Sequence, residues 1–211
     1  MTDYFLSISS GTGENEDVEP YEHAYGGLLI IRGSLRVNGH DVIDSNAALL
    51  RKGDTFELAA ESQWVRFDFS KDAPIEPVQI GTKIILPLST GASDVLLRMD
   101  EVEFPPGAVA YRHVHPGDGI RFLIEGQLQL IADHHEEVAT PGHAWFEAAN
   151  SPVRAEASPD HTTTRFVRFM ILPPACLGKA TINILDEDEA KLPRQQATRR
   201  HFDEIVHLDL G

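Results

Sequence analysis

An internal repeat constrains the fold of this chain more than any other feature of its sequence. A segment that reads as strand, glycine turn and strand occurs as Leu29–Val37 and again as Phe122–Leu130. After each copy the same three landmarks follow in the same order: a glycine-led turn, an Ala-Ala pair and an aromatic-Val-Arg-Phe strand. They are Gly53 and Gly142, Ala59–Ala60 and Ala148–Ala149, and Trp64–Phe67 and Phe166–Phe169. The repeat predicts two tandem copies of one domain.

The residue pattern inside each copy indicates strands rather than helices. Segments such as Lys83–Leu88, Val95–Met99 and Arg165–Leu172 are short, rich in β-branched and aromatic residues, and separated by Gly, Pro, Asn and Asp. Helical periodicity is almost absent. Strands at this spacing are typical of an all-β sandwich or barrel.

Polar segments predict where the domains begin and end. The Pro-containing stretch Ser70–Pro77 reads as a linker, which places the first domain at residues 1–75 and the second at 76–175. Residues 176–211 form a tail of different character, which we expect to pack back on the barrels. The alternation in Ile205–Leu210 predicts a final strand, which pairs with the edge of the first domain or with a partner chain.

Composition excludes several classes of function. The apolar fraction of 42% is enough for a sizeable core, and the net charge of −15 opposes binding to nucleic acid or to an anionic membrane. No stretch approaches the roughly 20 apolar residues of a membrane span, and the N-terminus lacks the pattern of a secretory signal. Because Cys176 is the only cysteine, no internal disulfide is possible, and we expect a cytoplasmic protein.

One motif in the second copy points to a family. The segment Pro106–Gly126 reads Gly, five residues, His-x-His and a later Gly, and a second glycine-led motif follows. The matching positions are Gly107, His113, His115, Gly126 and Gly142. The sequence here resembles the cupin superfamily, well over residues 95–173 and more loosely over 20–70. The resemblance implies a bicupin of two tandem RmlC-like barrels, each a double-stranded β-helix or jelly roll.

The paired histidines are the candidate metal ligands. Residues two apart on a strand face the same side, so His113 and His115 should present two imidazoles to the interior of one barrel. Imidazole suits Fe, Mn, Ni, Zn and Cu. The resemblance implies one divalent transition metal at this site, completed by a Glu and a third His.

This chain departs from the family pattern at both of those additional positions. Gly119 stands at the usual Glu position, and Val153 stands at the usual third His position. Asp118 and Glu147 are the carboxylates that a shifted loop or the second-motif strand would place near the site. The first copy aligns Pro20 and Glu22 with the two histidines, so it is interpreted as a scaffold.

Three side chains are expected to line the pocket of the second barrel: Tyr111, Arg121 and Glu147. Tyr111 shares strand parity with His113, and Arg121 shares it with Gly119. A guanidinium inside a barrel needs a partner. For Arg121 that partner is either a bound anion or an internal carboxylate from Glu103, Glu125 or Glu147.

The sequence leaves the function open between classes. The first is a metal-dependent small-molecule enzyme of dioxygenase or isomerase type, with metal on His113 and His115. The alternative is a non-catalytic bicupin that binds or senses a small, anionic ligand, and a structural role is the third. Sheet edges need cover, so we also expect a homodimer.

Overall fold

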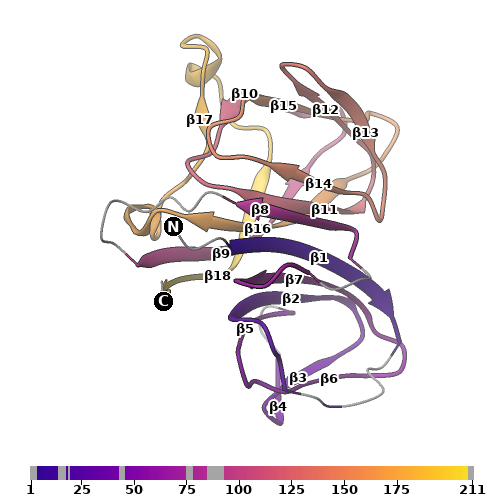
Figure 1. The fold of residues 1–211 in the computed structure, drawn as a ribbon. Coiled ribbons are helices and arrows are strands. Elements are labelled where there is room, and N and C mark those ends of the chain that lie inside the picture. The colour runs from indigo at the N-terminus through magenta and orange to yellow at the C-terminus, as the bar shows by residue number, and fades with distance from the viewer. Residues whose placement is uncertain are drawn as a thin grey trace. The chain divides into compact units, whose positions relative to one another are not determined.

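The computed structural model describes residues 4–13, 18, 20–42, 46–74, 78–84 and 93–208. The chain divides into two compact units, residues 1–85 with 210–211 and residues 86–209. Each unit is built almost entirely from strands, and the prediction of an all-β chain with two tandem barrels is confirmed (Figure 1). The predicted limits of 1–75, 76–175 and 176–211 stay predictions.

The first unit contains two sheets. A five-stranded sheet has the order β5-β2-β7-β1-β8, and a small sheet has the order β4-β3-β6. All pairings are antiparallel. The strands are β1 (Tyr4–Thr12), β2 (Tyr25–Arg32), β3 (Leu35–Val37), β4 (His40–Asp41), β5 (Ala47–Arg51), β6 (Phe56–Leu58), β7 (Gln63–Ser70) and β8 (Ile80–Ile84).

The second unit contains two five-stranded sheets, β14-β11-β16-β9-β18 and β13-β12-β15-β10-β17. Two short 3₁₀ helices, η1 (Pro174–Cys176) and η2 (Glu189–Lys191), interrupt its C-terminal part. Its strands are β9 (Asp94–Phe104), β10 (Val109–Val114), β11 (Gly119–Glu125), β12 (Leu128–Ala132), β13 (Glu136–Ala139), β14 (Ala144–Glu147), β15 (Val153–Ala157), β16 (Thr164–Leu172), β17 (Asn183–Ile184) and β18 (Ala197–His207).

The two units share one strand order, which explains the sequence repeat. The order β5-β2-β7-β1-β8 in the first unit corresponds to β14-β11-β16-β9-β18 in the second, and β4-β3-β6 corresponds to β13-β12-β15. The register agrees too, because Leu29 pairs with Val65 as Phe122 pairs with Val167. Among the described residues of the first unit, no strand corresponds to β10. The histidine-bearing strand therefore belongs to the second unit.

The repeated glycine of the β-turn is required by the backbone. Gly33 and Gly126 have φ of 99° and 81°, a left-handed conformation that favours glycine. A Cβ at Gly33 would lie 2.5 Å from the Ser62 hydroxyl, and one at Gly126 would lie 2.4 Å from the Thr163 carbonyl. The glycine thus lets each hairpin turn tightly against a neighbouring strand.

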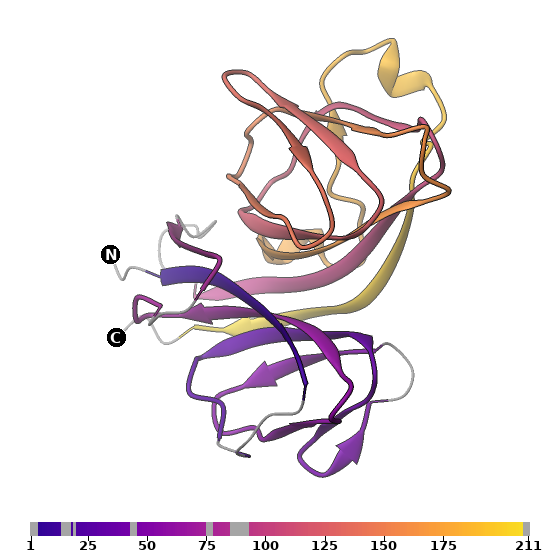
Figure 2. The same cartoon turned by 90° about the vertical axis from the view of Figure 1, so that its right-hand side faces the viewer.

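The C-terminal strand completes the second unit. β18 pairs antiparallel with β9 along its length, from Ala197 opposite Glu103 to His207 opposite Asp94 (Figures 1 and 2). The strand expected over Ile205–Leu210 is therefore present as far as His207, whereas positions 209 and 210 lie outside the described residues. The prediction that it pairs with an edge of the first domain was wrong. β18 pairs with β9 and so covers that edge of the sheet β14-β11-β16-β9-β18 in the second unit.

Each unit has its own apolar core. In the second unit the core gathers along one part of the barrel from residues such as Phe104, Leu123, Leu128, Trp145 and Phe166. In the first unit it includes Leu28, Ile30 and Leu50. The core fills only part of the second barrel, and the rest is lined by polar side chains. Among the described residues, no helix is long and apolar enough to span a membrane.

Candidate functional site

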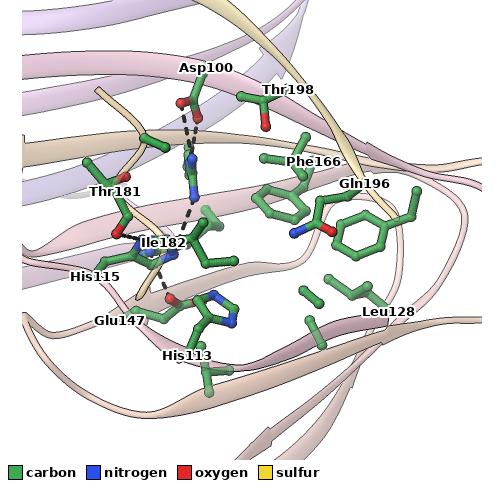
Figure 3. A pocket seen from close by; sticks show the side chains of 18 of the residues that line it. Asp100, His113, His115, Leu128, Glu147, Phe166, Thr181, Ile182, Gln196 and Thr198 are labelled. Atoms are coloured by element: carbon green, nitrogen blue, oxygen red, sulfur yellow. Dashed lines mark hydrogen bonds and ion pairs between the residues drawn. The ribbon is translucent and has the colours of Figure 1, made fainter. Parts of the chain in front are cut away.

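A cavity of about 310 Å³ lies inside the second unit. Its wall has two chemically different parts (Figure 3). His113, His115 and Glu147 gather at one end, whereas Leu128 and Phe166 lie at the other. A cavity with an apolar wall and a few converging polar groups is the usual form of a small-molecule site.

A bulge in β10 decides which of its side chains enter this cavity. The pairing of β10 with β15 shifts register between Ala110 and His113, so strict alternation is lost there. Ala110, His113 and His115 are buried and line the cavity, as expected of the two histidines. Tyr111 does not line it. Its hydroxyl accepts a hydrogen bond from Gln195 Nε2 at 3.0 Å, on the exposed side of the strand.

The hydrogen bonds of the two histidines define their tautomers. His113 Nδ1 lies 2.6 Å from the Tyr111 carbonyl, and His115 Nδ1 lies 3.0 Å from the Thr181 carbonyl. A carbonyl can only accept, so both Nδ1 atoms donate. In a neutral ring the Nε2 atom is then an acceptor. The rings meet edge to face with centroids 4.9 Å apart.

Both imidazoles are held in the neutral form. Burial lowers the pKa of His113, and the nearby Glu147 and the bond to Tyr111 offset only part of that effect. Burial lowers the pKa of His115 further, together with the positive charges of Arg168 and Arg121. Desolvation penalises the cationic ring, so near neutral pH these side chains act as hydrogen-bond acceptors.

Arg121 occupies the space that the family's Glu would use. Its guanidinium folds back so that Nη1 donates to the Gly119 carbonyl at 2.6 Å, and Nη2 lies 2.8 Å from Glu147 Oε2. A Cβ at Gly119 would lie 3.1 Å from Arg121 Nη1 and 2.8 Å from the Phe169 carbonyl. The lack of a Glu side chain at position 119 therefore makes room for the Arg121 guanidinium. Of the three carboxylates expected as internal partners of Arg121, Glu147 is the one that pairs with it.

The Arg121–Glu147 pair is incompletely matched. The Nη2 atom is buried without a well-aligned hydrogen-bond acceptor, although Glu147 is close enough for an ion pair. Glu147 Oε1 accepts instead from Trp145 Nε1 at 2.9 Å. Burial lowers the pKa of Arg121 to about 10, so it stays cationic at neutral pH.

A second arginine of the cavity wall, Arg168 on β16, was not singled out from the sequence, and its side chain is 11% exposed. Its Nε and Nη2 atoms donate to the two oxygens of Asp100 at 2.5 and 3.1 Å, and its Nη1 lies 3.3 Å from His115 Nε2. Burial alone would lower the pKa of Arg168, but Asp100 raises it above the ordinary value. The available signal was a single charged residue, Arg168, inside the otherwise apolar run Phe166–Leu172.

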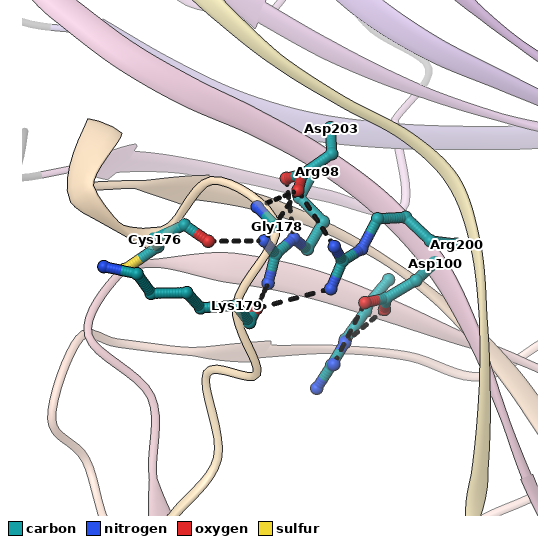
Figure 4. A network of polar contacts seen from close by, with 8 residues as sticks. Arg98, Asp100, Cys176, Gly178, Lys179, Arg200 and Asp203 are labelled. Carbon is teal, nitrogen blue, oxygen red and sulfur yellow. Dashed lines mark hydrogen bonds and ion pairs between the residues drawn. The ribbon is translucent and has the colours of Figure 1, made fainter.

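The loop that orients His115 is fixed by a buried polar network (Figure 4). Arg98, which is fully buried, donates to the carbonyls of Cys176 and Lys179 at 2.8 Å each and pairs with both oxygens of Asp203. These bonds hold the segment that carries Thr181, the acceptor for His115. Arg98 is therefore a positioning residue for the cavity wall.

The side chains at this site do not fit a transition-metal ion. Dedicated sites use three or four protein ligands. Among the described residues, no group of three or more His, Cys, Asp or Glu side chains is placed to hold a metal. Arg168 lies against the Nε2 atom that His115 would offer, and Glu147 is paired with Arg121. The assignment of metal to His113 and His115 stays a prediction, and the donor set opposes it.

The charge that lines the cavity is positive. Its described wall includes five arginines and two carboxylates, Asp100 and Glu147, in a chain whose net charge is −15. The arginines are Arg98, Arg121, Arg168, Arg194 and Arg200. Of these, Arg194 has no ion-pair partner in the part of the chain that the structure describes. A cationic hollow in an acidic protein favours anionic ligands.

Comparisons with known proteins agree with this architecture. Residues 100–167 match the family model of the cupin domain. The oxalate decarboxylase of Bacillus subtilis at pH 4.6 has 12% identity and a TM-score of 0.57, covering 89% of this chain and 72% of that one. A putative glyoxylate-induced protein of Pseudomonas aeruginosa has 14% identity and a TM-score of 0.50, covering 81% and 75%. Such identities show the fold alone. No curated protein matches the chain.

Proposed function

Because this chain has the cupin fold, with its cupin domain at residues 100–167, we propose that the second barrel binds a small organic carboxylate. One observation carries the proposal: two guanidiniums, the buried Arg121 and the largely buried Arg168, whose side chain is 11% exposed, line an internal cavity of about 310 Å³. A guanidinium attracts an anion placed beside it, and its charged N–H groups donate strong hydrogen bonds to a carboxylate.

Arg168 supplies the donors for that anion. A guanidinium has five N–H groups. The bonds of Arg168 to Asp100 use one on Nε and one on Nη2, and the contact with His115 uses one on Nη1. Each terminal nitrogen keeps one N–H, and two such donors in one plane match the two oxygens of a carboxylate.

The rest of the cavity selects the remainder of the ligand. Leu128 and Phe166 lie at the end of the cavity away from His113, His115 and Glu147, and the Trp145 ring contacts that of Phe166 in the same apolar wall (Figure 3). A hydrocarbon chain or ring placed there would lose contact with water. Its burial would make the free energy of binding more favourable by roughly 25 cal/mol for each Å² of apolar surface. The ligand class that satisfies both parts is a carboxylate with a short apolar body.

Isothermal titration calorimetry of the full chain tests the proposal. 3-Phenylpropionate and propionate are titrated beside their neutral counterparts, 3-phenylpropan-1-ol and propanamide. We expect the carboxylates to bind and the neutral compounds to bind at least tenfold more weakly, because a hydrogen bond to a charged group contributes about 1.5–3 kcal/mol.

A matched pair of variants locates the site. Arg168→Gln combined with Asp100→Asn removes the charge pair without leaving an unpaired buried ion, and should weaken carboxylate binding about tenfold or more. Arg165→Gln is the control, because Arg165 lies on the opposite face of β16 and pairs with Glu101. Equal binding in the double variant and the wild type would contradict the assignment.

A further inference from the structure

His113 presents an acceptor that no side chain or backbone N–H in the described part of the chain uses. Its Nδ1 donates to the Tyr111 carbonyl, so its Nε2 carries the lone pair of the neutral ring. Among the described residues, no donor reaches that Nε2 atom, whereas His115 Nε2 receives Arg168 Nη1. The two imidazoles therefore differ: one acceptor is occupied by the protein, and the other is left for a ligand.

The open acceptor lies beside the anion donors. The ring of His113 is 4.9 Å from that of His115, centroid to centroid, and His115 Nε2 is 3.3 Å from Arg168 Nη1. His113 and Glu147 lie next to each other in the polar end of the cavity (Figure 3). The His113 ring is therefore separated from the Arg168 guanidinium only by the ring of His115.

We propose that the carboxylate bound by this barrel carries a hydroxyl on the carbon next to it, so that the ligand class is a 2-hydroxy acid. The inference rests on the proposed function and adds the second polar contact. The carboxylate accepts from Arg168, and the hydroxyl donates to His113 Nε2.

An ammonium at the same carbon is the competing donor, and the charge of the site opposes it. Two cationic guanidiniums line the cavity beside its polar groups, Arg121 next to Glu147 and Arg168 next to His115. The carboxylates that would offset an ammonium are already engaged, Asp100 by Arg168 and Glu147 by Arg121. A neutral hydroxyl supplies the hydrogen without adding a third positive charge.

Ligand series that differ only at this carbon test the inference on the wild-type chain. The first series is 3-phenylpropionate, 3-phenyllactate and phenylalanine, and the second is propionate, lactate and alanine. In whichever series binds, we expect the hydroxy acid to bind about threefold to tenfold more tightly than the unsubstituted acid, and the amino acid to bind most weakly.

The outcomes separate the two proposals. Equal affinity for the hydroxy acid and the unsubstituted acid, or tightest binding of the amino acid, would overturn the 2-hydroxy acid and leave carboxylate binding in place. If no carboxylate of either series bound, the proposed function itself would fail, and this inference would fail with it.

A variant identifies the acceptor. His113→Phe keeps a planar ring but removes Nε2, so the ratio of hydroxy-acid to unsubstituted-acid affinity should fall to about one. His143→Phe is the control, because His143 pairs with Glu137 outside the cavity and should keep the wild-type ratio. An unchanged ratio in a folded His113→Phe protein would assign the preference to another group. The wild-type series decides the ligand class whether or not that variant folds.

Discussion

Replacing Arg98 with Met should strongly destabilise the second unit. Arg98 is fully buried and donates to Asp203, to the Cys176 carbonyl and to the Lys179 carbonyl (Figure 4). Met fills much of the same volume but donates nothing. The substitution therefore isolates the polar network from the packing around it.

The magnitude follows from the groups left behind. Removing one member of a buried ion pair costs about 3–5 kcal/mol, because the other charge stays desolvated. Asp203 keeps hydrogen bonds from Arg200 Nη1 at 3.0 Å and from the Gly178 N–H at 2.8 Å, which moderates that loss. The carbonyls of Cys176 and Lys179 each lose one donor but keep another, the Lys179 N–H at 3.0 Å and Arg200 Nη2 at 3.3 Å, so they add little to the loss. We expect the free energy of unfolding to fall by about 3–5 kcal/mol.

Urea unfolding followed by tryptophan fluorescence measures this change. The chain has two tryptophans, so Trp64→Phe leaves Trp145 as the reporter of the second unit. Arg200→Gln is the control. It removes another partner of Asp203, but at a partly exposed site, where a pair contributes about 0–1 kcal/mol. A loss below about 1 kcal/mol for Arg98→Met, or equal losses for both variants, would refute the reasoning.

Three further predictions concern charge, metal and assembly. Hydrogen bonds from His201 and Arg165 outweigh burial and hold the pKa of Glu101 at about 2 against an ordinary 4.5. Its stabilising contribution, about 1–3 kcal/mol after solvent screening, is therefore present above pH 4.5 and lost as the pH falls towards 2, and Glu101→Gln should flatten that acid limb of the denaturation profile. Elemental analysis of untagged protein purified without chelator should find no full equivalent of transition metal, whereas one equivalent that disappears in His113→Ala/His115→Ala would restore the assignment made from the sequence. Light scattering should give twice the chain mass of 23.3 kDa, and a monomer at high micromolar concentration would contradict the expected homodimer.

The repeat was the most informative part of the sequence. Gly33 and Gly126 mark equivalent turns because both adopt a backbone conformation that side chains disfavour, so the pattern carried a direct structural signal. Likewise, the nearly continuous run of apolar and aromatic residues in Phe166–Leu172 indicated a strand, and most of it is buried in β16. Signals of this kind are local, since they depend on the residues of one turn or one strand.

The site could be predicted only in part. Placing His113 and His115 in the barrel followed from the motif, and both line the cavity. The placement of Tyr111 beside them relied on unbroken alternation, which the bulge between Ala110 and His113 removes. A bulge depends on how β10 meets β15, and the sequence of β10 does not reveal it.

The sequence by itself determined the duplication, the all-β class and the two inward histidines, because each of these is written in spacing along one stretch of chain. Only the tertiary structure decided which charges meet. Arg168 finds Asp100 across β16 and β9, and Arg121 finds Glu147 across β11 and β14. A buried charge needs a partner of opposite charge. Here the two partners are far apart in the sequence, so only the folded chain shows which residues pair. Those pairs engage both carboxylates of the cavity wall, Asp100 and Glu147, beside five lining arginines.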